Sequence, residues 1–133
     1  MSEAPANGDA HSTILIAEDD ALIRLTLADH LQDHGFKVLE ASNGDEALAI
    51  MAAPAFKIDL VFTDVMMPGV TDGFALAKWV AENQPSVPVV ITSGDADKIE
   101  AAEASRENAF VRKPYDLDAL TAVLRKALDE RKT

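Results

Sequence analysis

Residues 14–20 read Ile-Leu-Ile-Ala-Glu-Asp-Asp, so an apolar run is followed at once by carboxylates. The run does not alternate between apolar and polar positions, which is typical of a strand buried on both faces of a parallel sheet. Similar runs occur at 58–63, 87–91 and 109–111, and a partly alternating run occurs at 36–40. The sequence therefore predicts five strands.

Amphipathic segments separate these runs. Ile23, Leu27 and Leu31 recur at a spacing of four, which predicts one apolar face of a helix that ends near Gly35. The other expected helices span 46–53, 74–83, 95–105 and 117–128. Strands that alternate with helices predict an α/β fold, a doubly wound five-stranded parallel sheet with helices on both faces.

Length and composition limit the class of protein. The 133 residues are the size of one domain, and a hydrophobic content of 48% is enough for a core. The absence of cysteine excludes disulfides and thiolate sites. Acidic residues outnumber basic ones by 23 to 12, and the net charge of −11 argues against direct nucleic-acid binding or attraction to an anionic membrane. No apolar run approaches the roughly 20 residues of a membrane span.

The first residues differ in composition from the rest. Residues 1–12 are rich in Ala, Pro, Asn and Gly and lack the basic and apolar regions of a signal peptide, so we expect a short flexible tail. Residues 13–133 are expected to form the folded domain. The lack of cysteine fits a reducing compartment, and we expect a cytoplasmic protein.

Polar side chains follow the apolar runs where the strands are expected to end. In chain order they are Glu18, Asp19 and Asp20, then Asp64, then Thr92 and Ser93, and finally Lys113. The carboxyl ends of parallel strands meet at one edge of a sheet, so these side chains should converge. Crowded carboxylates repel one another unless a cation compensates, and oxygen ligands favour Mg²⁺ or Mn²⁺.

This combination has a specific chemical use. A carboxylate beside Mg²⁺ and a lysine can attack a phosphoryl group and form an aspartyl phosphate. The metal and the lysine would offset the charge on the phosphoryl oxygens, and a hydroxyl could then bind the phosphate. Each residue alone has an ordinary structural explanation, because acids cap helices, lysines are solvated and Ser or Thr occupy turns. The prediction rests on their occurrence together.

The motifs resemble those of the receiver domain of two-component response regulators. They are Ile14-Leu15-Ile16-Ala17-Glu18-Asp19-Asp20, Asp64-Val65-Met66-Met67-Pro68, Asp72-Gly73, Thr92-Ser93-Gly94 and Lys113-Pro114. The resemblance covers nearly the whole chain and implies a flavodoxin-like sheet with strand order 2-1-3-4-5. It identifies 13–133 as a receiver domain.

The resemblance also implies roles for individual residues. Asp64 would be the phosphoacceptor. Glu18 and Asp19 would bind the metal together with Asp64 and the backbone carbonyl of Met66, with Asp19 the more direct ligand of the acidic pair. Lys113 would contact the phosphoryl oxygens. Asp20 then falls outside the acidic pair, facing solvent or capping the helix.

Further implied features concern the switch and two loops. Ser93 rather than Thr92 matches the switch hydroxyl, and Phe110 matches the rotameric aromatic residue, although it lacks the hydroxyl of the commoner tyrosine. The Lys113–Pro114 peptide is expected to be cis. The loop Gly69-Val70-Thr71 holds one residue more than the usual stretch between the phosphoacceptor and Asp-Gly.

The implied function is a phosphorylation-activated signalling switch. A histidine kinase or histidine phosphotransfer protein would supply the phosphoryl group in a Mg²⁺-dependent reaction, and a downstream protein would receive the signal. The domain would catalyse its own phosphorylation and slow dephosphorylation without being a dedicated enzyme. Because the chain ends just past the last expected helix, it is either a stand-alone regulator or a piece of a longer protein; the Lys-Thr ending has no linker composition, so we expect a stand-alone regulator.

Two other functions are weighed against this one. A phosphatase of the haloacid dehalogenase type also starts with an aspartate after a strand, but it needs a second aspartate where this chain has Met66. A degenerate receiver acting only as an interaction module typically lacks the acceptor or the lysine, and both are present here.

A pair of histidines lies outside these motifs. His30 and His34 are four apart on the first expected helix, a spacing that can hold zinc. No third ligand is evident in the sequence, so we expect no metal site there.

Overall fold

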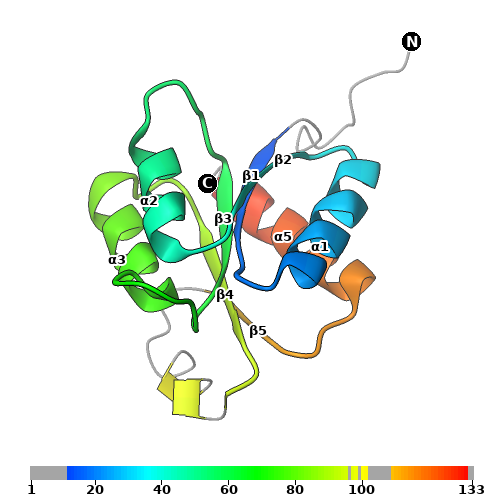
Figure 1. Ribbon diagram of the computed structural model, residues 1–133. Helices are drawn as coiled ribbons and strands as arrows, with labels where there is room; N and C mark the ends of the chain where they lie inside the picture. Colours follow the sequence, from blue (N-terminus) through cyan, green and yellow to red (C-terminus); the bar gives the residue numbers. More distant parts are fainter. Residues whose placement is uncertain (1–11, 96, 99, 102–108, 132–133) are drawn as a thin grey trace.

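The computed structural model describes residues 12–95, 97–98, 100–101 and 109–131. The strands in this part are β1 (Thr13–Ala17), β2 (Lys37–Ala41), β3 (Leu60–Asp64), β4 (Val89–Ser93) and β5 (Ala109–Arg112). The helices are α1 (Ala21–Asp33), α2 (Gly44–Ala52), α3 (Gly73–Asn83) and α5 (Leu117–Glu130). The strands form one parallel sheet in the order β2-β1-β3-β4-β5, as expected (Figure 1).

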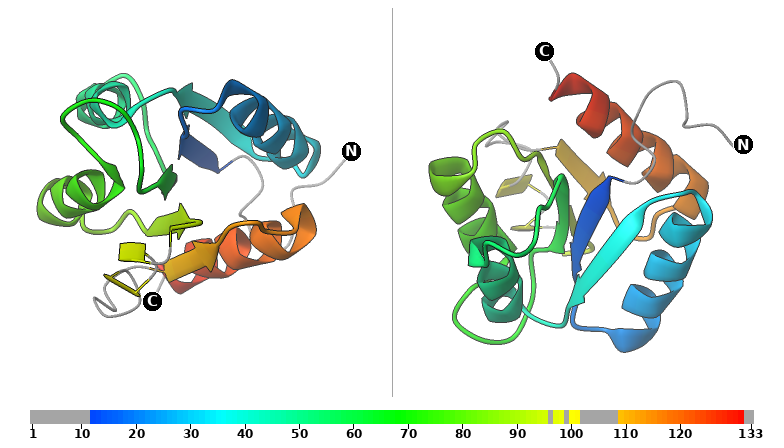
Figure 2. Two further views of the ribbon diagram at one scale, coloured as in Figure 1. Left: turned by 60° about the horizontal axis from the view of Figure 1, so that its bottom comes forward. Right: turned by 90° about the horizontal axis from the view of Figure 1, so that it is seen from above.

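Helices cover both faces of the sheet. Helices α1 and α5 lie on one face and α2 and α3 on the other, which gives three layers (Figures 1 and 2). Each face has its own core, because successive residues of a strand point to opposite sides. On one side Leu27 and Leu124 pack against Phe62, and on the other Leu76 and Met51 pack in the same cluster as Val61.

All strands except β1 extend further toward their carboxyl ends than expected from the sequence. The fourth strand was expected at 87–91, but β4 is Val89–Ser93, because Pro88 lacks an N–H and pairing continues to Ser93. The third strand likewise ends at Asp64, which pairs in register with Thr92. Asp64 and Ser93 are therefore the last residues of strands and not the first residues of loops.

Acidic or amide side chains cap the N-termini of the helices α1, α2, α3 and α5. Asp20, Asn43, Asp72 and Asp116 each accept a hydrogen bond from the backbone N–H three residues further on, which satisfies a donor that the helix cannot use itself. Asp20 thus caps α1, one of the two roles expected for it.

Parts of two expected segments fall outside the described residues. Residues 97–98 and 100–101 are helical, and Asp95 accepts hydrogen bonds from the N–H groups of Asp97 and Lys98, but the remainder of the expected helix 95–105 is not described. Residues 1–11 of the expected tail also lie outside the described residues. Ser12 is buried, and its carbonyl oxygen accepts a hydrogen bond of 2.9 Å from Lys37 N. None of the described helices is long and apolar enough to cross a membrane.

Candidate functional site

Three carboxylates meet at the carboxyl edge of the sheet. Glu18 and Asp19 directly follow β1, and Asp64 ends the neighbouring β3. One carboxylate oxygen from each of the three lies within 4.8 Å of the others. Glu18 and Asp64 are buried and Asp19 is exposed, so the cluster reaches solvent through Asp19.

Lys113 joins this cluster from β5, on the other side of β4. Its Nζ donates a hydrogen bond of 2.6 Å to Asp64 Oδ2 and one of 3.0 Å to Glu18 Oε1. Burial, the largest single effect, would lower the pKa of Lys113, but the hydrogen bonds to Asp64 and Glu18 and the attraction of their negative charges together raise the pKa above its ordinary value of 10.5. Lys113 is therefore a permanent cation at neutral pH.

The position of Lys113 depends on the backbone around it. Its N–H donates to the carbonyl oxygen of Ser93 at 3.0 Å, which extends the β4–β5 pairing by one step. The Lys113–Pro114 peptide is cis, which confirms the prediction. The chain turns there toward α5, while the lysine side chain stays on the acidic cluster.

Glu18 is the most buried of the acids, with 4% of its surface exposed. Burial raises its pKa above the ordinary value of 4.5, against the opposing effect of hydrogen bonds from Asp20 N and from Lys113. A single lysine faces three carboxylates, so the cluster keeps an excess of negative charge.

This charge excess is the observation that fits a metal ion. The donor set consists of oxygen atoms, which are the ligands that hard cations such as Mg²⁺ prefer. Neither cysteine nor histidine belongs to the cluster, which argues against zinc there. The acidic pocket therefore suits Mg²⁺ in its residues and in its charge.

Asp64 is held by the loop that follows it. Its second carboxylate oxygen, Oδ1, accepts a hydrogen bond of 3.2 Å from Met66 N, while the Met66 side chain is exposed. Gly73 packs against the backbone of Asp64 and Val65 so closely that a Cβ atom at this position would overlap both residues. Because Gly73 has no Cβ, the Asp-Gly motif lets the start of α3 contact the end of β3, which carries Asp64, directly.

The loop with the additional residue is fixed on α2. Thr71 Oγ1 donates a hydrogen bond of 2.6 Å to Asp45 Oδ1, and Val70 N donates to Asp45 Oδ2 at 3.4 Å. The hydrogen bond from Thr71 is the main cause of a lowered pKa of Asp45. The loop therefore returns to α3 without disturbing Asp64.

The hydroxyl groups at the end of β4 differ in their partners. Ser93 Oγ accepts a hydrogen bond of 3.0 Å from Asp95 N. Thr92 Oγ1 is buried and has no hydrogen-bond partner among the described residues. Phe110, one strand further, is half-buried and packs against the core on the α2–α3 side.

Sequence reasoning missed two residues near this site. Arg24 on α1 donates a hydrogen bond of 2.8 Å to the carbonyl oxygen of Glu18 and pairs with Glu40 at 3.2 Å, so it braces the backbone of the acidic segment. Tyr115 follows the cis peptide, and burial raises its pKa above 10.0. Its hydroxyl has no hydrogen-bond partner among the described residues. The signal in the sequence that could have indicated Tyr115 is its closeness to Lys113 and Pro114.

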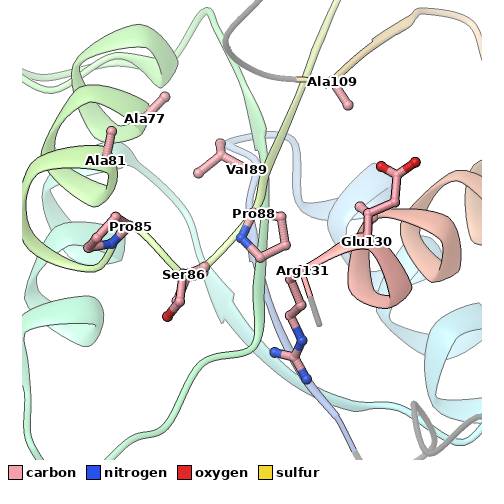
Figure 3. A pocket seen from close by; sticks show the side chains of 11 residues that line it. Ala77, Ala81, Pro85, Ser86, Pro88, Val89, Ala109, Glu130 and Arg131 are labelled. Carbon is pink, nitrogen blue, oxygen red and sulfur yellow. The ribbon is translucent and has the colours of Figure 1, made fainter. Parts of the chain in front are cut away.

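A separate hollow lies at the opposite end of the sheet. It is lined by residues before β4 and at the end of α5, among them Pro85, Pro88 and Arg131, and by Ala109 (Figure 3). None of the acidic cluster lines it.

Comparison with known proteins agrees with this geometry. The family model for the response regulator receiver domain matches residues 14–125, and the chain belongs to this family. The transcriptional regulator NtrC of Salmonella typhimurium is 32% identical over 117 residues, which are 86% of this chain and 24% of NtrC. This chain thus spans about a quarter of the length of that relative.

Solved structures show the same fold. A response regulator receiver domain from Clostridium thermocellum superposes with a TM-score of 0.81 at 29% identity, covering 91% of this chain and 97% of that one. The response regulator TrrA of Thermotoga maritima, solved in complex with Mg²⁺ and BeF, superposes with a TM-score of 0.77 at 25% identity, covering 87% of this chain and 98% of that one. The expected flavodoxin-like receiver fold is confirmed.

Proposed function

We propose that Asp64 accepts a phosphoryl group from a phosphohistidine of a partner protein, in a reaction that depends on Mg²⁺. An oxygen of the Asp64 carboxylate attacks phosphorus, and the bond between phosphorus and the imidazole nitrogen of the partner breaks. The bonding electron pair stays on that nitrogen, and the product here is an acyl phosphate. No further reactant is needed, and the chain has Met66 where a phosphatase of the haloacid dehalogenase type has its second aspartate.

One observation carries this proposal. Lys113 Nζ lies 2.6 Å from Asp64 Oδ2 and 3.0 Å from Glu18 Oε1, so a fixed cation already neighbours the attacking carboxylate. The same ammonium group can move onto a phosphoryl oxygen once Asp64 is phosphorylated. Positive charge placed where negative charge develops lowers the barrier to phosphoryl transfer.

The metal ligands follow from the same cluster. Glu18, Asp19 and Asp64 would hold Mg²⁺ through carboxylate oxygens. The resemblance to receiver domains adds the backbone carbonyl of Met66 as a further ligand. When bound, Mg²⁺ supplies charge neutralisation to the phosphoryl oxygens. The Mg²⁺ and BeF in the similar structure of TrrA support this assignment.

Ser93 and Phe110 are proposed to convert the phosphate into a change of shape. Phosphorylation adds about −1.5 to −2 charges at Asp64. The Ser93 hydroxyl would then leave Asp95 N and donate a charge-assisted hydrogen bond to the phosphate. The space that it leaves can admit the half-buried ring of Phe110, which lies beside Ile91 in the β4–β5 register.

An apolar face beside the site suits the phosphohistidine partner. Leu22 and Leu25 on α1 are exposed by 75% and 56%. Leu22 also lines an apolar groove that reaches Lys113 and Pro114. A histidine kinase or histidine phosphotransfer protein that covers this face would bring its phosphohistidine to Asp64. The downstream target is a protein that binds elsewhere on the domain.

A small phosphodonor such as acetyl phosphate tests the proposal. With Mg²⁺, intact-mass measurement should show one added phosphoryl group that is lost slowly, and chelation of the metal should abolish the uptake. Continuous turnover of the donor without an accumulating adduct would indicate a phosphatase instead. Absence of any adduct under both conditions would leave only the phosphate-independent interaction module.

A further inference from the structure

A second cluster of metal-ligating side chains lies between α1 and α5, away from the acidic pocket. His30 and His34 are one turn apart on α1, and α5 places Asp118 beside them. One ligand atom from each of the three lies within 4.8 Å of the others. The sequence showed the histidine pair but not the third ligand, because Asp118 is supplied by the packing of α5 on α1.

The hydrogen bond of His34 leaves one of its nitrogens ready to bind. His34 Nδ1 lies 2.9 Å from the carbonyl oxygen of His30, and since a carbonyl can only accept, Nδ1 carries the proton. In the neutral ring the lone pair is then on Nε2. Backbone carbonyls orient metal-binding histidines in this same way in known metal sites.

His30 presents a buried nitrogen without a hydrogen bond. His30 Nε2 is buried and has no hydrogen-bond partner among the described residues. The nearest acid is Asp118, whose Oδ1 is 3.5 Å away. An ion pair with so exposed a carboxylate stabilises little, so the missing hydrogen bond of His30 Nε2 is costly, and a metal ion bound between the two groups would compensate it.

The distance between the ligand atoms of His30 and Asp118 fits a tetrahedral ion. With metal–ligand bonds of about 2.0–2.1 Å, two ligands of a tetrahedral zinc ion are about 3.4 Å apart. The separation of 3.5 Å between His30 Nε2 and Asp118 Oδ1 is close to that value. Asp118 is exposed, so its side chain can adjust freely, and the rings of His30 and His34 already lie with centroids 4.3 Å apart.

We propose that His30, His34 and Asp118 form a binding site for Zn²⁺, with water as the fourth ligand. Two imidazoles and one carboxylate are ligands that zinc accepts and that Mg²⁺ does not select. His34 and Asp118 both line a groove between the two helices, through which the ion can enter. The bound ion links the end of α1 to the start of α5. The site is independent of phosphoryl transfer at Asp64.

Zinc titration of the full chain tests the proposal. With millimolar Mg²⁺ present to occupy the acidic pocket, calorimetry should show one Zn²⁺ bound per chain. His34→Gln and Asp118→Asn should each weaken binding by at least about tenfold, since even indirect partners of metal ligands contribute that much. The exposed position of Asp118 makes its variant safe for folding.

Matched variants and a spectroscopic readout complete the test. His11→Gln removes the third histidine of the chain, and Asp129→Asn removes another acid of the same groove; both should bind zinc as the wild type does. Imidazole ¹⁵N resonances of His30 and His34 should shift with zinc, and those of His11 should not. The proposal is overturned if zinc does not bind, if the control variants lose it equally, or if Asp64→Asn abolishes it.

Discussion

Lys113 connects the two buried carboxylates of the acidic pocket, and its removal would leave them facing each other. We predict that Lys113→Met lowers the free energy of unfolding by roughly 1–3 kcal/mol in the absence of Mg²⁺, because Glu18 and Asp64 lose a hydrogen-bonded cation. Mg²⁺ should bind the variant more tightly than the wild type and restore much of the loss. Urea denaturation with and without Mg²⁺ measures both effects.

The control for this prediction is Lys78→Met on the exposed side of α3, which should change stability little and respond to Mg²⁺ as the wild type does. A Lys113→Met variant as stable as Lys78→Met in metal-free buffer would show that the ion pairs contribute nothing.

The raised pKa of Glu18 implies that the stability of the protein depends on pH. A carboxyl group whose pKa is raised on folding binds its proton more tightly in the folded protein, so its contribution to stability falls as pH rises from 4.5 through the raised value. Without Mg²⁺, Glu18→Gln should therefore gain stability relative to the wild type as pH increases across this range. Denaturant unfolding of both proteins at a series of pH values tests the sign, and a constant difference between them would contradict it.

At the scale of elements, α3 begins in direct contact with the strand end that carries Asp64. We predict that Gly73→Ala lowers stability by about 1–3 kcal/mol, because its Cβ would overlap the backbone of Asp64 and Val65. It should also slow phosphorylation, since Asp64 must shift. Gly94→Ala is the control for stability, because there a Cβ meets only Lys113 Cβ at 3.5 Å. Equal melting temperatures for the two variants would refute the prediction.

Much of this arrangement could be predicted from the sequence, for a physical reason. Parallel strands are buried on both faces, so they appear as apolar runs, and the acids that follow them fall at one edge of the sheet. Strand ends were less predictable, because pairing between neighbours carries β3 to Asp64 and β4 to Ser93.

Side-chain contacts between different elements could not be predicted. Asp118 reaches His30 only because of how α5 packs on α1, and no local pattern in the sequence encodes that packing. Arg24 was missed for the same reason, since its partner Glu40 is on another element. A spacing rule identifies residues on one helix face but says nothing about the neighbouring helix.

For the whole molecule, the proposed switch predicts where phosphorylation changes the structure. Ser93 ends β4, and Phe110 lies on the edge strand β5, whose residues are exposed or half-buried. With Mg²⁺ and beryllofluoride as a phosphate mimic, hydrogen exchange should change in peptides that cover residues 93–112. We expect the partner surface along the segment 95–105, β5 and α5; most of that segment lies outside the described residues, so this stays a prediction. Changes confined to α1 would contradict it.

The most direct test of the central claim is to locate the phosphoryl group after incubation with acetyl phosphate and Mg²⁺. Peptide mass mapping should find it on Asp64 in the wild type and in Asp33→Asn, a variant at the exposed end of α1. Asp64→Asn should fold, as judged by circular dichroism, and should take up no phosphoryl group. Acid-labile phosphate in folded Asp64→Asn at the wild-type level would show that another residue is the acceptor.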